Sequence, residues 1–212
     1  MSENHISKKK PSYSISKALL TYLKKYSRIL KVPISYSDLV HYCSTIPLED
    51  KDGNLTLWET VLYTDSETSE LNNNLTEIYS ILKSDGSAQI GHLAVARIDY
   101  CSFGNSQPFR IKIINQLNDN HDYFYVKKVD ASRVYGLELE HFLSPNKINY
   151  LVYNDIIIEE HIMGIPGDQF IESSFNNEEH DEVRLAKEFV KFNERCFIRL
   201  LGDMRSYNFV VD

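Results

Sequence analysis

The chain has 212 residues, of which 42% are hydrophobic and 25% are charged, and its formal net charge is −7. This composition excludes wholesale disorder and fits one large domain or two small ones. The acidic balance argues against general nucleic-acid binding, because affinity for phosphate backbones needs a basic surface. Cys43, Cys101 and Cys196 show no CxxC spacing, so neither a zinc site nor a disulfide framework is indicated. A reducing, cytoplasmic location is therefore expected, and no apolar window approaches the ~20 residues of a membrane span.

The charge is unevenly distributed along the chain. Residues 1–31 carry a net charge of +7, so the remainder carries −14. Residues 1–12 are polar and are expected to form a disordered tail. The basic start favours a solvated helix face, and binding of nucleic acid or an anionic surface through it is the weakest of three functional hypotheses.

Residues 13–90 are expected to form a small helical unit. Ser14 or Ser16 is positioned to cap a first helix that runs to about Leu30. Apolar residues at helical spacing then predict a longer helix that ends at Asp85-Gly86. These apolar residues are Leu71, Leu75, Ile78, Tyr79, Ile81 and Leu82. The segment 55–63 fits a helix or a strand equally well.

The periodicity changes at Leu93, where alternating apolar and polar residues begin. They predict three strands in a β-meander, a helix over 131–143, a second strand pair and, after a Gly/Pro break, a long amphipathic helix. The strands cover roughly 93–100, 109–114, 123–129, 148–153 and 156–162, and the long helix covers 181–199. The fold class is therefore α+β with an antiparallel sheet.

The residues after the long helix carry the one motif with chemical content. They read Leu201-Gly202-Asp203, four residues, then Asn208 and the apolar residues Phe209–Val211. This segment resembles the catalytic loop of kinase-fold phosphotransferases, in the branch of the aminoglycoside phosphotransferases and choline kinases. That branch has His-Gly-Asp, four residues, Asn and an apolar strand, so Leu201 departs from the pattern at its first position.

The resemblance implies a kinase-like amino lobe over 91–165 and the start of a carboxyl lobe over 166–212. It implies ATP and magnesium as cofactors and an unknown phosphate acceptor. Asp203 would be the catalytic base or orient the acceptor hydroxyl, and Asn208 would be a metal ligand. The fixed spacing suits this chemistry, because a short loop directs the carboxylate and the amide oxygen to one point.

The resemblance also implies residues that bind the nucleotide. The third strand should carry a lysine for the phosphates, and both Lys127 and Lys128 qualify. The partner of that lysine should be a Glu on the next helix, either Glu138 or Glu140. Backbone groups of the strand that leads into the hinge, around Glu160 and Ile162, would bind adenine.

Two departures from the family pattern bear on activity. The loop 101–107 holds a single glycine, whereas protein kinases have a glycine-rich loop there. The second metal-binding Asp of the family has no counterpart in the four residues after Asn208. We therefore expect an incomplete phosphotransferase fragment that is inactive by itself. The alternative is a pseudokinase-like module that binds a nucleotide or a protein. The apolar face of the last helix would favour association.

Overall fold

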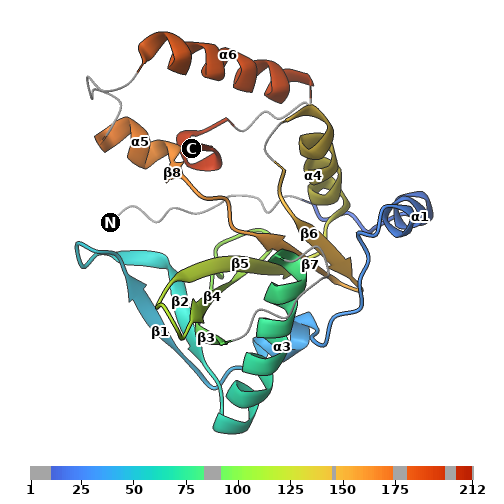
Figure 1. Ribbon diagram of the computed structural model, residues 1–212, viewed down its shortest axis with the longest axis vertical. Helices are drawn as coiled ribbons and strands as arrows, with labels where there is room; N and C mark the ends of the chain where they lie inside the picture. Colours follow the sequence, from blue (N-terminus) through green and yellow to red (C-terminus); the bar gives the residue numbers. More distant parts are fainter. Residues whose placement is uncertain (1–10, 84–91, 145–146, 174–180, 199–203, 212) are drawn as a thin grey trace. The chain divides into compact units, whose positions relative to one another are not determined.

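The computed structural model describes residues 11–83, 92–144, 147–173, 181–198 and 204–211 (Figure 1). The chain forms two compact units. Unit 1 consists of residues 1–135 and 148–161, and unit 2 consists of residues 136–147 and 162–212. The predicted α+β class is confirmed, and the large sheet is antiparallel.

A seven-stranded sheet in the order β1-β2-β3-β4-β5-β7-β6 forms the framework of unit 1, and all neighbouring strands are antiparallel. The strands are β1 (Ser44–Glu49), β2 (Leu55–Leu62), β3 (Leu93–Tyr100), β4 (Phe109–Asn115), β5 (His121–Lys128), β6 (Tyr150–Tyr153) and β7 (Ile156–Glu160). Period-two alternation divides the faces: Phe109, Ile111 and Ile113 are buried on one side, whereas Arg110 and Lys112 lie on the other.

Four helices begin in the described part of unit 1. They are α1 (Lys17–Lys25), α2 (Tyr36–Val40), α3 (Asp65–Lys83) and α4 (Ala131–Leu143), and the second half of α4 belongs to unit 2. The side chain of Ser16 accepts a hydrogen bond from the Leu19 N–H at 3.2 Å, so Ser16 caps α1.

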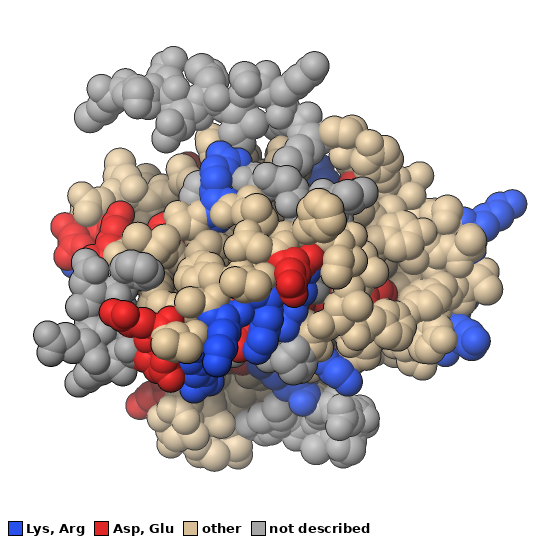
Figure 2. Space-filling model, turned by 90° about the horizontal axis from the view of Figure 1, so that it is seen from above, with Lys and Arg blue, Asp and Glu red and all other residues tan. Residues whose placement is uncertain are grey.

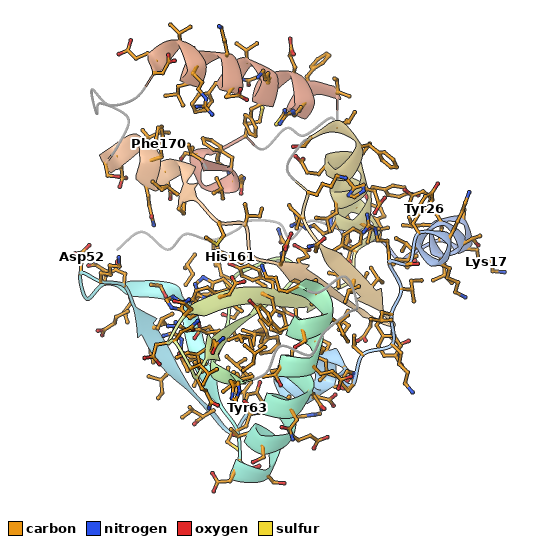
Figure 3. All side chains as sticks on the ribbon, in the orientation of Figure 1. Lys17, Tyr26, Asp52, Tyr63, His161 and Phe170 are labelled. Atoms are coloured by element: carbon orange, nitrogen blue, oxygen red, sulfur yellow. The ribbon has the colours of Figure 1, made fainter. Side chains whose placement is uncertain are left out.

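Helix α3 covers the apolar face of the sheet. Its residues Leu71, Leu75, Ile78 and Leu82 recur at helical spacing and are buried in the core. Burial of such a side chain contributes about 2 kcal/mol. The end of the helix is tied to β5, because Tyr79 donates a hydrogen bond to Asp122 and Lys83 forms an ion pair with the same carboxylate. Tyr63, which Figure 3 labels, lies between β2 and α3 in the chain and also packs against this core.

The expectation of a helical unit over 13–90 was wrong in part, because the segment contains two strands besides its helices. Strands β1 and β2 form a hairpin within that segment, and β2 joins the sheet through Glu59 and Thr60. A turn that contains Asp52-Gly53 closes the hairpin, and Gly53 has a φ of +80° there. The residues that follow the predicted boundary at position 90 share one core with those before it. Strands are recognised in a sequence when apolar residues mark the buried face and polar residues mark the exposed one. In β2 the apolar residues Leu55 and Leu57 are exposed, so this alternation does not identify the strand.

A β-bulge interrupts β3. Val95 lies opposite Ile113 and Arg97 lies opposite Lys112, so Ala96 is an extra residue on β3. The simple alternation of the sequence places Val95 on the same face as Arg97 and Asp99. The bulge instead turns Val95 toward the core, with Ile98, while Arg97 pairs beside Lys112 on the opposite face.

Unit 2 contains α5 (Gly167–Ser173), α6 (Glu182–Ile198), a short 3₁₀ turn (Ser206–Asn208), and the strands β8 (Ile165–Pro166) and β9 (Val210–Val211), which pair with each other. Phe170, labelled in Figure 3, is the buried anchor of α5. Phe209 packs against Phe189 and Phe192 of α6. Val183, Val190 and Phe197 of α6 are exposed, while association through this helix stays a prediction.

Candidate functional site

The two candidate lysines point to opposite faces of the sheet. Lys127 lies opposite Ile157 of β7, and its Nζ is 2.8 Å from Oε2 of Glu159. Lys128 is exposed; its Nζ donates a hydrogen bond to Oε1 of Gln107 and lies over the ring of Tyr36. The structure therefore separates two residues that the sequence leaves equivalent, because neighbouring positions of a strand face opposite sides.

Glu159 binds two cations on the face opposite α3. Besides Lys127, Arg133 in the first turn of α4 donates from Nε to Oε1 at 2.8 Å and from its terminal nitrogen to Oε2. The Glu159 side chain is only 2% exposed. Burial alone would raise its pKa, but the hydrogen bonds and charges of Arg133 and Lys127 outweigh burial and lower the pKa to about 2. For Lys127 the balance is opposite, because burial outweighs the attraction of Glu159 and lowers its pKa. The cluster of Lys127, Arg133 and Glu159, here called the Glu159 cluster, has a net charge of +1.

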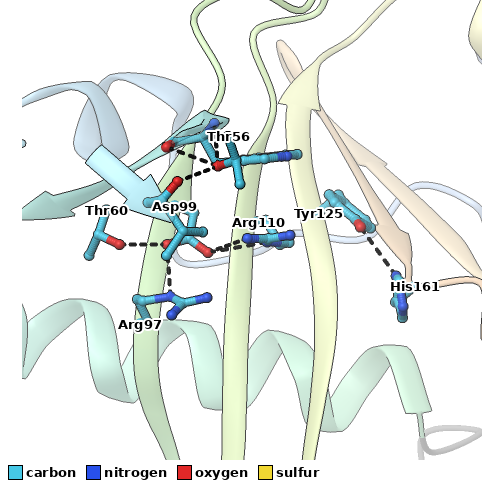
Figure 4. A network of polar contacts seen from close by, with 9 residues as sticks. Thr56, Thr60, Arg97, Asp99, Arg110, Tyr125 and His161 are labelled. Carbon is cyan, nitrogen blue, oxygen red and sulfur yellow. Dashed lines mark hydrogen bonds and ion pairs between the residues drawn. The ribbon is translucent and has the colours of Figure 1, made fainter. Parts of the chain in front are cut away.

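Asp99 forms a second cluster on the same face (Figure 4). It is fully buried, accepts two hydrogen bonds from Arg110 at 2.8 and 3.1 Å, and accepts another from the Thr60 hydroxyl at 2.9 Å. Arg97 forms an ion pair with it at 2.8 Å. These contacts join β2, β3 and β4, and the Asp99 cluster (Asp99, Arg97 and Arg110) also has a net charge of +1.

Aromatic rings lie beside the two clusters. The guanidinium of Arg110 lies 4.6 Å from the ring centroid of Trp58, and the Trp58 and Tyr125 centroids are 6.3 Å apart. The Tyr125 hydroxyl is 3.2 Å from Nδ1 of His161, and a dashed line marks this contact in Figure 4. Burial lowers the pKa of His161, so the ring favours its neutral form. This face of the sheet therefore combines cation-rich clusters with flat apolar rings.

The predicted hinge residues lie at the boundary between the units. The Glu160 N–H donates to the Asn149 carbonyl at 3.0 Å, and its carboxylate accepts from the Asn149 N–H at 2.6 Å. Ile162 is the first residue of the second segment of unit 2 and is 44% exposed. Because the Glu160 N–H already binds Asn149, that N–H is not a free donor for adenine.

The two candidate glutamates of α4 belong to unit 2, whereas Lys127 belongs to unit 1. Glu138 is buried and Glu140 is half-buried. The pairing of either with Lys127 stays a prediction. The partner of Lys127 within unit 1 is Glu159, which comes from a strand and not from a helix.

Asn208 lies at the end of the 3₁₀ turn in unit 2 and is exposed, and its N–H donates to the Arg205 carbonyl at 2.8 Å. The Gly167 N–H binds the Phe209 carbonyl at 3.0 Å, next to Asn208. The glycine-containing linker and the loop that carries Asn208 are therefore neighbours within one unit. Asp203 lies outside the described residues.

Sequence reasoning missed Glu159, Arg133 and the Asp99 cluster. A signal exists for Glu159, which follows the apolar run Ile156–Ile158 and is followed by a second Glu. A carboxylate inside a buried strand requires cations near it, since an unpaired buried charge is costly. The cations that meet it come from β5 and α4, so the register of the strands was needed to identify them.

The chain matches no known protein-family model, no curated protein and no solved structure. Within the described ranges, no three His, Cys, Asp or Glu side chains are grouped so that they could hold a metal ion. In the same part of the chain, no helix combines the length and apolar character needed to cross a membrane.

On the face drawn in Figure 2, basic and acidic side chains lie close to one another among other residues.

Proposed function

We propose that the chain is the nucleotide-binding part of a kinase-like, ATP-dependent phosphotransferase. The element order that motivates the proposal is three strands, a helix, two strands, a linker, a long helix and the loop that carries Asn208. Lys127 would contact the nucleotide phosphates, and Asn208 would contribute a magnesium ligand. Asp203 would orient the acceptor hydroxyl or accept its proton.

The observation that supports this proposal most is the Glu159 cluster. Its single buried carboxylate binds two cations, so one positive charge is left uncompensated beside it. Arg133 alone is sufficient to keep Glu159 paired, because it donates two hydrogen bonds to it. Lys127 can therefore turn to a phosphate without leaving a buried carboxylate unpaired. Bound magnesium would neutralise charge that develops on the phosphates.

A pseudokinase-like module that binds nucleotide without phosphate transfer is the second candidate. Leu201 in place of the histidine of the motif and the single glycine of the loop 101–107 favour this version. The two candidates share the nucleotide site and differ in turnover. Binding of ATP accompanied by no ADP release would favour the second, whereas ADP release that depends on Asp203 would favour the first.

Thermal unfolding in the presence of ATP and magnesium tests the shared part of the proposal. At a ligand concentration of 100 times Kd, binding stabilises the folded state by about 2.7 kcal/mol, which raises Tm by roughly 5–10 °C for a chain of this size. We expect Lys127→Met to remove most of this shift. Lys128→Met is the matched control, because the neighbouring lysine lies on the other face, and it should keep the shift. Equal loss in both variants, or no shift for the unchanged chain, would contradict the proposal.

A further inference from the structure

The sheet of unit 1 opens between β2 and β3. The two strands pair only through Glu59–Tyr100 and Thr60–Asp99, whereas β3 and β4 pair along their whole length. Beyond Thr60, the Val95 N–H binds the Asn72 side chain of α3 at 2.8 Å and not a strand. The bulge at Ala96 lies at the same place. The strands therefore diverge there, with the amino-terminal half of α3 beside the gap.

A cavity of about 540 Å³ fills this gap. This volume lies within the roughly 300–1,000 Å³ of small-molecule sites. The lining comes from the end of β2, the start of α3 and the bulged part of β3, and includes Val61, Leu71, Ile98, Asn72, Ser69 and Arg97. The lining thus combines apolar side chains with a few polar ones.

Arg97 gives the cavity its charge. Among the lining residues that the structure describes, it is the one Lys or Arg, and these residues include no Asp or Glu. Asp99, its ion-pair partner, is fully buried and already receives two hydrogen bonds from Arg110. Among the described residues, the Nε of Arg97 contacts Asp99, and neither of its two terminal nitrogens has a hydrogen-bond partner. A guanidinium fork with free donors suits an oxyanion.

We propose that this cavity binds a small molecule with an apolar body and an oxyanion head, either a carboxylate or a phosphate monoester. The head accepts hydrogen bonds from the terminal nitrogens of Arg97. The body extends from the face that carries Arg97 through the gap between β2 and β3, and packs between Val61 of β2 and Leu71 of α3. The site is separate from the Glu159 cluster and does not depend on the nucleotide proposal, because Lys127 and Arg133 do not line it.

Isothermal titration of the full chain with 3-phenylpropionate tests the site, with 3-phenylpropionamide as a neutral analogue of nearly the same shape. Phenyl phosphate identifies which oxyanion is preferred. We expect saturable binding of at least one of the two anions and at least tenfold weaker binding of the amide, since a hydrogen bond to a charged group contributes roughly 1.5–3 kcal/mol.

Arg97→Gln should weaken binding of the anion at least about tenfold. Asp99 keeps Arg110 and Thr60 in this variant, so the fold should persist, which the fluorescence of Trp58 checks. Lys112→Gln is the matched control: Lys112 lies opposite Arg97 on β4, carries the same charge and does not line the cavity. Binding should survive this change.

Ser69→Phe tests the volume without changing the charge. Ser69 lines the cavity and is exposed on α3, and within the described ranges its hydroxyl binds only the Asp65 carbonyl of its own helix. The fold should therefore tolerate a larger ring at this position. The ring should block the ligand. Equal affinity for acid and amide, unchanged affinity in Arg97→Gln and Ser69→Phe, or no binding of either anion would each overturn the proposal. None of these results would bear on the response to ATP.

Discussion

Replacing Glu159 with Gln changes the shape of the side chain very little, but it should strongly lower the stability of unit 1. Glu159→Gln leaves Lys127 and Arg133 side by side with no counter-charge. Removing one partner of a fully buried pair costs about 3–5 kcal/mol, and water at the half-exposed Arg133 places this change at the low end of that range. We expect a loss of about 3 kcal/mol in the free energy of unfolding at pH 7, measured by urea titration followed through Trp58. Glu77→Gln is the control, because Glu77 is an exposed residue of α3 in the same unit, and this change should alter stability by less than about 0.5 kcal/mol.

The same carboxylate predicts a pH dependence. The pKa of Glu159 is about 2 in the folded chain, below its usual 4.5, so the ionised form is favoured by folding. The contribution of the ionised carboxylate to the free energy of unfolding is complete above about pH 4.5. It is lost as the pH falls from there through 2. The stability difference between the unchanged chain and Glu159→Gln should therefore shrink across this range. If the stability difference between the two proteins stayed constant from pH 7 to pH 2.5, Lys127 and Arg133 would not stabilise the ionised form of Glu159.

The partners of individual charged residues could not be predicted from the sequence. The pair Lys127-Lys128 is visible in the sequence, but which lysine meets a carboxylate depends on the register of β5 against β7. Glu159 and Arg133 are 26 residues apart, and Asp99 and Arg110 are 11 apart. No local pattern connects such positions, because each pair forms only after strands and helices have assembled.

At the scale of elements, the close approach of the linker to the loop of unit 2 gives a further prediction. A Cβ on Gly167 would collide with the ring of Phe209 and lie 2.5 Å from the Ser206 carbonyl oxygen. Gly167→Ala should therefore displace the 3₁₀ turn that ends at Asn208 and cost about 1–3 kcal/mol. Backbone NMR signals of Ser206–Val211 should shift in this variant.

Gly136→Ala provides the matched control for that experiment. Gly136 lies in α4, within the same unit, and a Cβ there would meet nothing within 4 Å. Alanine in a helix interior is favoured over glycine by roughly 0.5–1 kcal/mol, so this variant should be as stable as the unchanged chain or more so. Signals of the 3₁₀ turn that moved equally in both variants would refute the role assigned to Gly167.

Helices and strands whose apolar residues recur at a regular spacing were predicted well, whereas elements without such a spacing were not. Helix α3 and strand β4 each carry a clear apolar stripe, and both were predicted from it. The β1–β2 hairpin has several exposed apolar residues, so its pattern matched neither period. The partner that stabilises it is β3, which begins more than thirty residues after β2, so tertiary pairing decided its conformation.

At the scale of the whole molecule, the two units should unfold separately. Among the described residues, unit 2 buries three hydrophobic side chains, Leu137, Phe170 and Cys196, whereas unit 1 buries most of the core. We expect unit 2 to unfold at lower urea concentration. Trp58 is the single tryptophan and lies in unit 1, so its fluorescence should change later than the helical circular dichroism, part of which comes from α5 and α6. Coincident curves would show one cooperative unit instead.

The two units meet in the chain close to the Gly/Pro linker. A change of composition marks the Gly/Pro linker, and unit 2 resumes at Ile162, close to the predicted boundary at 165/166. The expected boundary at position 90 has no counterpart, because α3 and the sheet strands on both sides of it bury their apolar faces together. A switch from helical to strand periodicity marks a change of element, and it becomes a domain boundary only when each side has its own core.

The extra residue at Ala96 has a consequence for tracing the ancestry of this chain. Before the bulge, the odd-numbered residues Leu93 and Val95 face the core. After it, the odd-numbered residues Arg97 and Asp99 face the opposite side of the sheet. A distant relative without the bulge would be one residue shorter at this point and would still keep every side chain on its proper face. An alignment drawn through β3 without a gap would match core positions to charged ones on one side of Ala96. A single-residue gap placed there would restore the correspondence along the whole strand.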